Sequence, residues 1–406
     1  MSVLTSQTPG LQVDVLDDVA SWDALEMEWG ELFEASPTAS PPLRWEWLRQ
    51  WWRVYGPVYG GQGLRIVTVR RGGHLIGALP LYLHIGHRSP LWAHHLGFLS
   101  TGESRSEATR PDYLDLLHAP GEARTCLDAI LPALLDPEVG RWDILDLCDI
   151  DRGSPLLAWR DQAPRDIRVV VIPRGACPVA DLSGGFEAYL GRLSANARQR
   201  ARRMLRAVES TGIRFEVAST PSDAAQFFDQ LVRLHQARWN SSDRPGSFSA
   251  HRFTEFHRTL AELWVPTGKA ILARLARDGE PLAVLYGFIN GTKFDFYQSG
   301  VDLRAVGRVN SPGIAAHLAL MRYLANRGIM GYDFLRGSSE YKDRLSTTCN
   351  SLVRLRLVRP GFRAAADEAF EEAFEASLRA ARWVAQEVRR ARRALAATGK
   401  PGHNPH

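Results

Sequence analysis

The residues best suited to catalysis follow an expected strand at residues 331–335. Tyr341 and Lys342 lie just beyond that strand, in a stretch that Gly337 precedes. A tyrosine hydroxyl can protonate a departing group, and a lysine ammonium can stabilise developing negative charge. We predict that both residues are catalytic, because a tyrosine and a lysine side by side in a glycine-bounded loop have no evident role in packing.

Two polar residues come shortly before this pair. Asp333 alternates with Tyr332 and Phe334, so on a strand its side chain faces away from both neighbours. Asp333 can then form a structural ion pair with Arg336, and on that alternative Tyr341 is only a packing ring. For Asp333 itself we favour the structural interpretation.

An anion site is predicted at the start of the preceding helix. Asn310-Ser311-Pro312-Gly313 opens an apolar pattern of helical period that runs to about Arg327 and ends at Gly328. Serine is a favoured N-cap, proline suits the first helical position, and glycine lets a ligand approach the backbone. The free N–H groups of such a helix start can bind an anion. An ordinary capped helix is the alternative.

A repeated order of elements has to position these residues. The patterns predict helices at 19–33, 45–54, 123–135, 186–193, 195–210, 222–239, 250–263 and 311–327, and strands at 11–15, 64–70, 75–85, 113–117, 142–147, 213–218, 269–277, 281–289, 292–299, 331–335 and 351–359. In order, 75–85, 113–117 and 142–145 correspond to 281–289, 294–298 and 331–334. The chain therefore reads as two related α/β units.

The boundaries follow from composition and length. A chain of 406 residues is long enough for two domains, and residues 173–185 are rich in proline and glycine. We predict an N-terminal domain at 1–175, a C-terminal domain at 176–360, and a C-terminal helix with a disordered tail at 361–406. That helix has an apolar stripe, which could cover the second domain or form a homodimer.

The motif at 332–344, together with the helix start at 310–313, resembles the acyl-binding half of GNAT-type N-acetyltransferases. It is most similar to the CelD-type branch, which is associated with cellulose biosynthesis and related to the Fem peptidyltransferases. The resemblance implies an α/β fold of mixed sheets with two tandem GNAT-like domains and no metal. In place of the usual glutamine- or arginine-rich glycine loop stand residues 307–313. It also implies a site for acetyl-CoA or another acyl-CoA as co-substrate, formed by Asn310, Ser311, Gly313, Arg336 and Gly337.

The acceptor is expected in a cleft between the domains. A serine-x-x-x-arginine helix start recurs in the CelD-type family, and its match here implies that Arg198 faces a ligand. For Arg202, Arg203 and Arg206 of that helix we expect a solvated face. His235 and Trp239 precede a polar loop that could act as a lid, and with Tyr297 they complete the predicted substrate-binding set. Taken singly, His235 reads as a satisfied surface histidine.

Composition limits the class of protein. Net charge is +5, and 45% hydrophobic with 23% charged residues is typical of a soluble globular protein. The four cysteines lack zinc-finger or Cys-x-x-Cys spacing, so we expect neither a disulfide framework nor a metal site. We recognise no signal peptide or membrane-spanning run, which favours the cytoplasm. Trp47 and Trp51 share one helix face and are assigned to packing.

We therefore expect an acyltransferase, and specifically an N-acetyltransferase. It would move an acyl group from acyl-CoA to an amine or hydroxyl of a sugar, a polysaccharide precursor or a small molecule. One alternative is a Fem-like transferase that uses aminoacyl-tRNA, which two arginine-rich segments at 192–206 and 389–393 could bind. Another is a non-catalytic GNAT-like scaffold in polysaccharide biosynthesis. DNA is not an expected partner.

Overall fold

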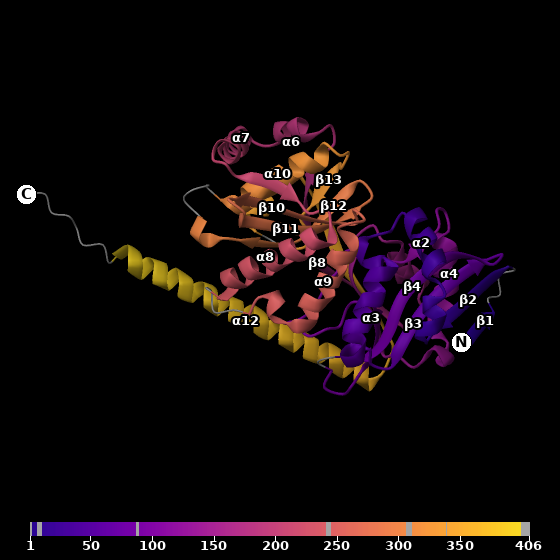
Figure 1. The fold of residues 1–406 in the computed structure, drawn as a ribbon. Helices are drawn as coiled ribbons and strands as arrows, with labels where there is room; N and C mark the ends of the chain where they lie inside the picture. Colours follow the sequence, from indigo (N-terminus) through magenta and orange to yellow (C-terminus); the bar gives the residue numbers. More distant parts are fainter. Residues whose placement is uncertain are drawn as a thin grey trace, which may run out of the picture.

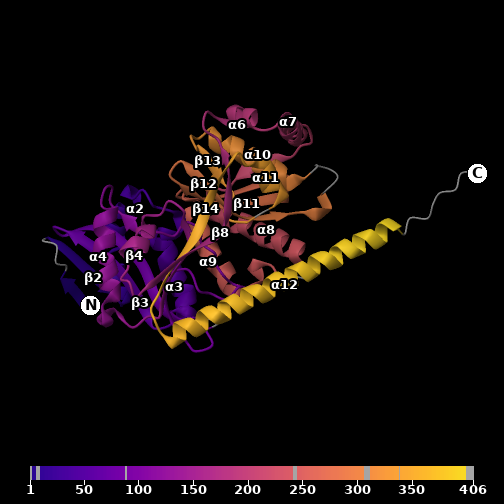
Figure 2. The same cartoon turned by 180° about the vertical axis from the view of Figure 1, so that it is seen from behind.

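The computed structural model describes residues 2–5, 10–86, 89–240, 245–305, 311–337 and 339–398. Two similar α/β halves lie side by side and share one 14-stranded mixed sheet within these residues (Figure 1). A long C-terminal helix, α12 (Phe362–Thr398), leaves the body and extends well beyond it, as Figure 2 shows from behind. The mixed α/β fold predicted from the sequence is confirmed. The predicted tail at 399–406 lies outside the described residues.

The N half builds one end of the sheet. Its central strands follow the order β2-β3-β4-β5-β7, antiparallel except for the parallel pair β5–β7. The strands are β1 (Ser2–Thr5), β2 (Leu11–Leu16), β3 (Gly63–Arg71), β4 (His74–Ile85), β5 (His94–Phe98), β6 (Leu117–His118) and β7 (Ile144–Asp151). The α-helices are α1 (Val19–Asp23), α2 (Glu26–Ala35), α3 (Trp45–Tyr59), α4 (Ala123–Leu135) and α5 (Trp159–Gln162).

The C half repeats this plan at the other end. Its strand order is β9-β10-β11-β12-β13, and only the pair β12–β13 is parallel. The strands are β9 (Arg214–Val217), β10 (Ala270–Arg277), β11 (Glu280–Asn290), β12 (Lys293–Val301) and β13 (Gly331–Asp333). The α-helices are α6 (Phe186–Arg192), α7 (Ala195–Ser210), α8 (Pro221–Asn240), α9 (His251–Trp264), α10 (Pro312–Ala325) and α11 (Glu340–Leu345).

Two long strands join the halves, because each pairs with a strand of the half that it does not belong to in sequence. β8 (Arg168–Asp181) follows the N half in sequence but pairs with β13 of the C half. β14 (Thr348–Val358) follows the C half but pairs with β7 of the N half. The two strands also pair with each other along most of their length. The boundary predicted at residue 175 therefore falls inside β8, where the chain crosses between the halves.

In each half the parallel strands pair over only three residues. His95–Gly97 of β5 pairs with Ile144–Asp146 of β7, and Lys293–Asp295 of β12 pairs with Gly331–Asp333 of β13. Beyond those residues the strands part. The pairing of β12 with β11 also shifts register here, which leaves Tyr297 as a bulged residue. Bulges of this kind are frequent beside active sites because they re-aim side chains.

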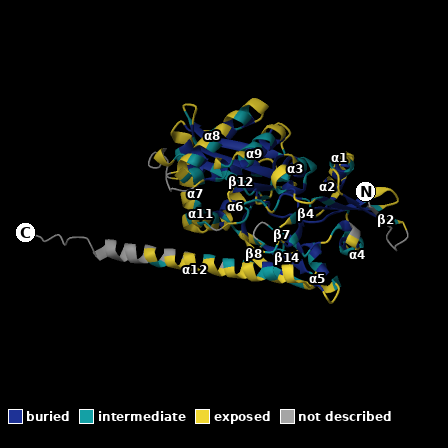
Figure 3. Cartoon of the chain, turned by 90° about the horizontal axis from the view of Figure 1, so that it is seen from below, coloured by how far each residue is buried: buried dark blue, intermediate teal, exposed yellow. Residues whose placement is uncertain are grey.

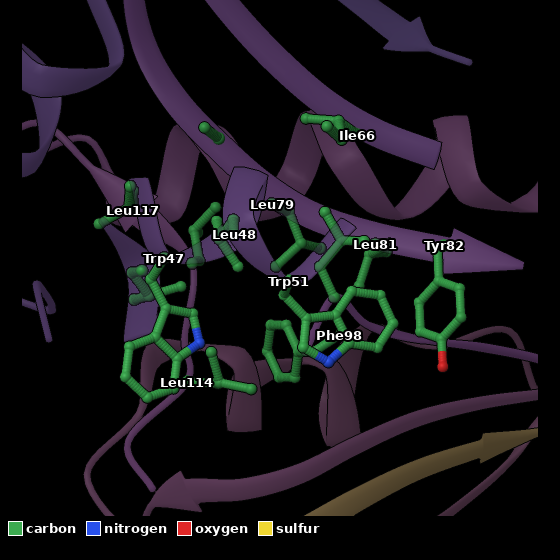
Figure 4. Packing of buried hydrophobic residues seen from close by; sticks show 14 of the residues in the cluster. Trp47, Leu48, Trp51, Ile66, Leu79, Leu81, Tyr82, Phe98, Leu114 and Leu117 are labelled. Carbon is green, nitrogen blue, oxygen red and sulfur yellow. The ribbon is translucent and has the colours of Figure 1, made fainter. Parts of the chain in front are cut away.

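The tryptophan-rich helix α3 packs as predicted. Trp47 and Trp51 are fully buried, and Figure 4 shows both indoles pointing into the core of the N half. Trp47 also contacts Trp264 of α9 at a centroid distance of 6.0 Å and Phe288 of β11 at 5.3 Å. These rings join the cores of the two halves.

Helix α12 is anchored only near its start. Ala364 is buried against Ile144 and Val358, whereas most of the helix is exposed (Figure 3). Among its described side chains, Trp383 is 64% exposed and Val384 52%. The apolar stripe therefore docks in its first turns and stands free farther along.

Some sequence expectations are wrong. No strand forms at 113–117: Tyr113 has a left-handed backbone with φ of 66°, and only Leu117–His118 pairs, as β6. The strand that corresponds to β12 is β5, at His94–Phe98, where two histidines and a glycine disguise the apolar pattern. Residues 340–345, expected as a loop, form the short helix α11.

Candidate active site

A cavity of about 740 Å³ lies between the two halves. Its walls come from the segment after β5, from β7, from the ends of β12 and β13, and from the first turns of α12. On the C-half side it begins where β12 and β13 part, because Phe296, Tyr297 and Gln298 line it directly after the last paired residue of β12. The segment 334–337 lines it directly after β13.

Of the two predicted catalytic residues, Lys342 lines this cavity. Its Nζ donates hydrogen bonds to the carbonyl oxygens of Phe334, at 2.7 Å, and Leu335, at 3.3 Å. An ammonium has three N–H donors, so one remains for a ligand. Burial lowers the pKa of Lys342, although nearby carboxylates such as Asp112 oppose the shift.

Tyr341 lies on the same helix but does not line the cavity. Its ring stacks on His317 at 5.3 Å and meets the edge of Phe334 at 6.1 Å. Burial raises the pKa of its hydroxyl. The expectation that this side chain has no packing role is wrong, because α11 turns its ring onto the core of the C half. Its catalytic role stays a prediction.

Asp333 and Arg336 do not pair with each other, contrary to the structural alternative. Asp333 is fully buried, and its Oδ2 accepts a 2.7 Å hydrogen bond from the Tyr113 hydroxyl. The Arg336 guanidinium lies 2.8 Å from the carboxylate of Asp149, and its main-chain N–H donates to Asp112 at 2.7 Å. Both residues instead reach partners in the N half, which a local reading of the sequence could not identify.

The start of α10 differs from the predicted cap. Ser311 has a left-handed backbone with φ of 65° and makes no side-chain cap hydrogen bond. Pro312 is buried, and a Cβ added at Gly313 would meet the Val301 side chain at 3.1 Å. The first N–H groups of α10 therefore lack a side-chain acceptor from Ser311, which keeps them suited to an anion. Asn310 lies outside the described residues.

Tyr297 is the predicted substrate residue that lines the cavity. Its hydroxyl donates to the Thr109 carbonyl oxygen at 2.5 Å, across the boundary between the halves. The Tyr297 hydroxyl oxygen also lies 2.8 Å from Nε2 of the buried His257. The bulged strand of the C half is thus fastened to the segment after β5 in the N half.

The other predicted substrate residues lie away from this cavity's lining. Arg198, near the start of α7, donates to the Gly191 carbonyl oxygen at 3.3 Å. His235 is only 4% exposed, so the expectation of a surface histidine is wrong, and it accepts a 3.0 Å hydrogen bond from the Trp239 indole. A ligand role for these three residues stays a prediction.

The N-half wall carries titratable residues that sequence reasoning missed. Burial raises the pKa of Glu103 to about 7, against hydrogen bonds that lower it. Burial also raises the pKa of Asp112 to about 7, although Arg336 opposes the shift. Burial alone would lower the pKa of His95, but Asp146 and Asp367 raise it to about 9. The weak signal in the sequence was a polar stretch at 100–112 between two apolar runs.

No group of three or more His, Cys, Asp or Glu side chains in the described part of the chain is arranged to hold a metal ion. The four cysteines are free thiols. Burial raises the pKa of Cys148, which lines the cavity, to about 12, so its thiol is a poor nucleophile near neutral pH. Within the described residues, no helix has both the length and the apolar character needed to cross a membrane.

Known proteins resemble this chain at the level of domain and fold. Residues 195–343 match the family of acetyltransferase (GNAT) domains. A search of curated proteins gave no significant match. FemX has a similar structure, with a TM-score of 0.57 and 11% sequence identity over 85% of this chain and 97% of FemX.

Two further solved structures share the fold across both halves. The C-terminal domain of a putative lysylphosphatidylglycerol synthetase from Agrobacterium fabrum gives a TM-score of 0.51 at 13% identity, over 87% of this chain and 96% of that chain. A conserved protein of unknown function from Bacteroides thetaiotaomicron gives 0.53 at 11% identity, over 85% and 99%. The chain thus combines a match to acetyltransferase (GNAT) domains in its C half with a two-part fold similar to that of FemX.

Proposed function

We propose that this chain is an acyltransferase that transfers an acyl group to an amine or hydroxyl held between its halves. The match of residues 195–343 to acetyltransferase (GNAT) domains supports the class of reaction. The observation that carries the proposal is the place of the cavity, which begins where β12 and β13 part, beside the bulge at Tyr297.

The residues that line the cavity beside β12 and β13 suit acyl transfer. An acceptor must attack a carbonyl carbon, so the site has to orient two partners, stabilise a developing oxyanion and move one proton. The bulge interrupts the ladder beside the cavity, and Lys342 presents a cationic donor to it. Because the nucleophile comes with the substrate, the poorly nucleophilic Cys148 is not needed.

Acyl-CoA is the proposed donor. The start of α10, with Ser311 and Gly313, offers N–H groups that lack a side-chain cap and could hold a pyrophosphate. Arg336 and Gly337 line the cavity. Calorimetric titration with acetyl-CoA tests the donor, with CoA and ATP as matched controls. We expect saturable binding, and an absence of heat at millimolar acetyl-CoA contradicts this donor.

A Fem-like transfer from aminoacyl-tRNA is the second candidate, and the similarity to FemX across 85% of this chain favours it. The arginine-rich helix α7 would then contact phosphates. Filter binding of tRNA over a salt series separates the two donors, because log K falls by about 0.7 to 0.9 per phosphate contact for each unit of log salt. Weak tRNA binding that does not change with salt concentration contradicts aminoacyl-tRNA as the donor.

The acceptor class extends the proposal. A CelD-type assignment favours an amino sugar or a polysaccharide precursor, and a non-catalytic scaffold in polysaccharide biosynthesis is the remaining alternative. A screen that measures the shift in Tm on adding amino sugars, nucleotide sugars or small amines distinguishes the enzyme from the scaffold. Stabilisation by an acceptor together with acetyl-CoA supports the enzyme. Binding of a saccharide with no donor binding and no turnover favours the scaffold.

A further inference from the structure

The acidic side chains that line the cavity differ in whether they have a cationic partner. Asp112 and Asp149 contact Arg336, and Asp146 contacts Arg354. The two acids from α12 are paired as well: Asp367 with His95 and Arg356, and Glu371 with Arg354 and Arg356. Glu103 is the exception among the acidic lining residues, since no described cationic group lies within ion-pair distance of its carboxylate.

The hydrogen bonds that Trp51 and Thr109 donate to the Glu103 carboxylate all reach one of its two oxygens. Oε1 accepts from the Trp51 indole at 2.6 Å and from the Thr109 hydroxyl at 2.6 Å, with the Thr109 main-chain N–H at 3.5 Å. None of these three donors reaches Oε2. The carboxylate is therefore held by one oxygen while the other stays available to a ligand in the cavity.

Thr109 also connects Glu103 to the proposed acyl-transfer site. Its hydroxyl donates to Glu103 and its carbonyl oxygen accepts from the Tyr297 hydroxyl. A single residue thus separates the free carboxylate of the N half from the bulged strand of the C half. An acceptor beside Glu103 would lie next to the wall where we place the acyl group.

We propose that Glu103 selects an amine acceptor and removes its proton during acyl transfer, an inference that rests on the proposed function. An unpaired carboxylate in a half-buried cavity attracts a cationic or proton-donating ligand. The acceptor nitrogen forms a bond to the acyl carbon, whose bond to the donor's sulfur or oxygen then breaks. Nitrogen gives its proton to Oε2 of Glu103, and the leaving atom departs with the electron pair and takes up a proton.

The environment of Glu103 supports a proton acceptor. Its pKa of about 7, raised by burial, is close to the optimum for a general base at neutral pH. The titratable groups around it are the phenols of Tyr55, Tyr82 and Tyr297, whose pKa values are all raised, so they stay neutral there. His84 lies against the adjacent Gly102, and Arg105 and Arg110 line the same cavity.

The test compares wild type, Glu103→Gln and Glu107→Gln. Glu107 is a matched control, because it lies four residues away in the same segment but binds Arg252 at 3.2 Å and does not line the cavity. Turnover is measured from pH 5.5 to 9 with acetyl-CoA, or aminoacyl-tRNA, and glucosamine, lysine and ethanolamine as acceptors. We expect Glu103→Gln to lower kcat by about a hundredfold or more and to lose the rise in rate near pH 7, at unchanged Tm. The Glu107→Gln profile should match wild type.

Each other outcome overturns the inference in a distinct way. If wild type transfers acyl groups and Glu103→Gln keeps its rate and pH profile, Glu103 is only a hydrogen-bond acceptor and the acyltransferase stands. If wild type transfers nothing from either donor to any amine, the proposed function fails and the role of Glu103 fails with it. Should Glu103→Gln unfold, ¹³C-carboxyl NMR of wild type decides, and a Glu103 carboxyl that titrates below pH 5 rejects a general base.

Discussion

The two halves end their short parallel pairings with the same residue type. Asp146 on β7 and Asp333 on β13 are each the last residue of a three-residue pairing. Each is bound by a side chain that the other half of the sequence supplies: Arg354 of β14 donates to Asp146 at 2.6 Å, and Tyr113 donates to Asp333 at 2.7 Å. The topology repeats, but an arginine binds Asp146 directly, whereas Asp333 accepts from a neutral hydroxyl and has the Lys293 ammonium 3.8 Å away.

This difference divides the cavity wall into two kinds of surface. Around Asp146 the charges continue, since Arg354 also binds Glu371 of α12 and His95 lies between Asp146 and Asp367. Beyond Asp333 the C half packs aromatic rings and brings two cations, Arg336 and Lys342, to the cavity. Residues at equivalent places in the repeated fold have thus diverged. The charge network around Asp146 and the carboxylate of Glu103 both lie outside the residues that match GNAT domains.

The largest effect is expected from Arg354→Ala. The change leaves Asp146 buried without the cation that counters the burial effect and holds its pKa well below the usual range. Removing one partner of a buried ion pair typically costs about 3–5 kcal/mol. Urea denaturation should show a loss of that order. The control Arg192→Ala, which removes a half-exposed partner of Asp181, should cost less than about 1 kcal/mol. Equal losses of unfolding free energy in the two variants would contradict the distinction between the buried and the half-exposed ion pair.

His95 should make stability depend on pH. Its pKa rises from 6.5 to about 9 in the folded protein, because Asp146 and Asp367 outweigh burial. A raised folded pKa gives stability that is complete below the unfolded value and is lost as pH rises from about 6.5 through 9. At about 1.4 kcal/mol per pKa unit the change is about 3.5 kcal/mol. The difference in unfolding free energy between wild type and His95→Gln, measured by denaturation across this pH range, isolates the contribution of His95 from that of other groups. A difference that does not change with pH contradicts the raised pKa of His95.

Much of the fold could be predicted because it depends on local periodicity. Helix 123–135 and helix 195–210 have the bounds predicted from the apolar pattern and the flanking residues. β5 was missed because its pattern is interrupted, and the exchange of β8 and β14 was missed because pairing between distant strands leaves no local signal. The site was predicted only on its C-half side, where the motif is contiguous.

The remaining site residues acquire their properties from distant parts of the chain. Glu103 is distinctive because Trp51 and Thr109 hold one of its oxygens in a buried wall, and no pattern at 100–112 encodes that. Asp333 looked like a partner of Arg336 because the two are near in sequence. Its actual partner, Tyr113, is 220 residues away. Long-range contacts of this kind follow from topology rather than from spacing.

Tyr341→Phe tests the predicted catalytic role of this tyrosine in the C half. Loss of a proton donor should lower turnover by about a hundredfold while donor binding is nearly unchanged. The phenylalanine keeps the stacking on His317, so Tm should also stay within a few degrees. Lys342→Ala is the companion variant, and it should weaken donor binding or turnover because Lys342 lines the cavity. Full turnover by Tyr341→Phe would assign the ring to packing alone.

Asp333→Asn tests the counterpart of Asp146 in the C half. The asparagine keeps the shape but loses the charge that Lys293 approaches at 3.8 Å, and its amide disturbs the hydrogen bond from Tyr113. We expect a loss of about 2 kcal/mol in unfolding free energy, with the activity of the folded fraction retained. Tyr113→Phe removes the same hydrogen bond from the other side, and a double-mutant cycle gives their coupling. A large fall in kcat at full stability would move Asp333 into the catalytic site.

The smallest effect is expected on α7, a helix that precedes β9 and has no counterpart among the described residues of the N half. Arg202 pairs with Glu187 at 2.7 Å, but both side chains are exposed, so Arg202→Ala should change stability by less than about 0.5 kcal/mol. Arg198 lies one helical turn earlier and is the residue that we predict to face a ligand. Arg198→Ala should raise KM for the ligand it contacts, whereas Arg202→Ala should leave KM unchanged. If both variants weaken tRNA equally and more strongly at low salt, α7 is a phosphate-binding face and the aminoacyl-tRNA donor gains support. If neither changes KM, Arg198 belongs to the solvated face, and the C half keeps its ligand contacts at the cavity alone.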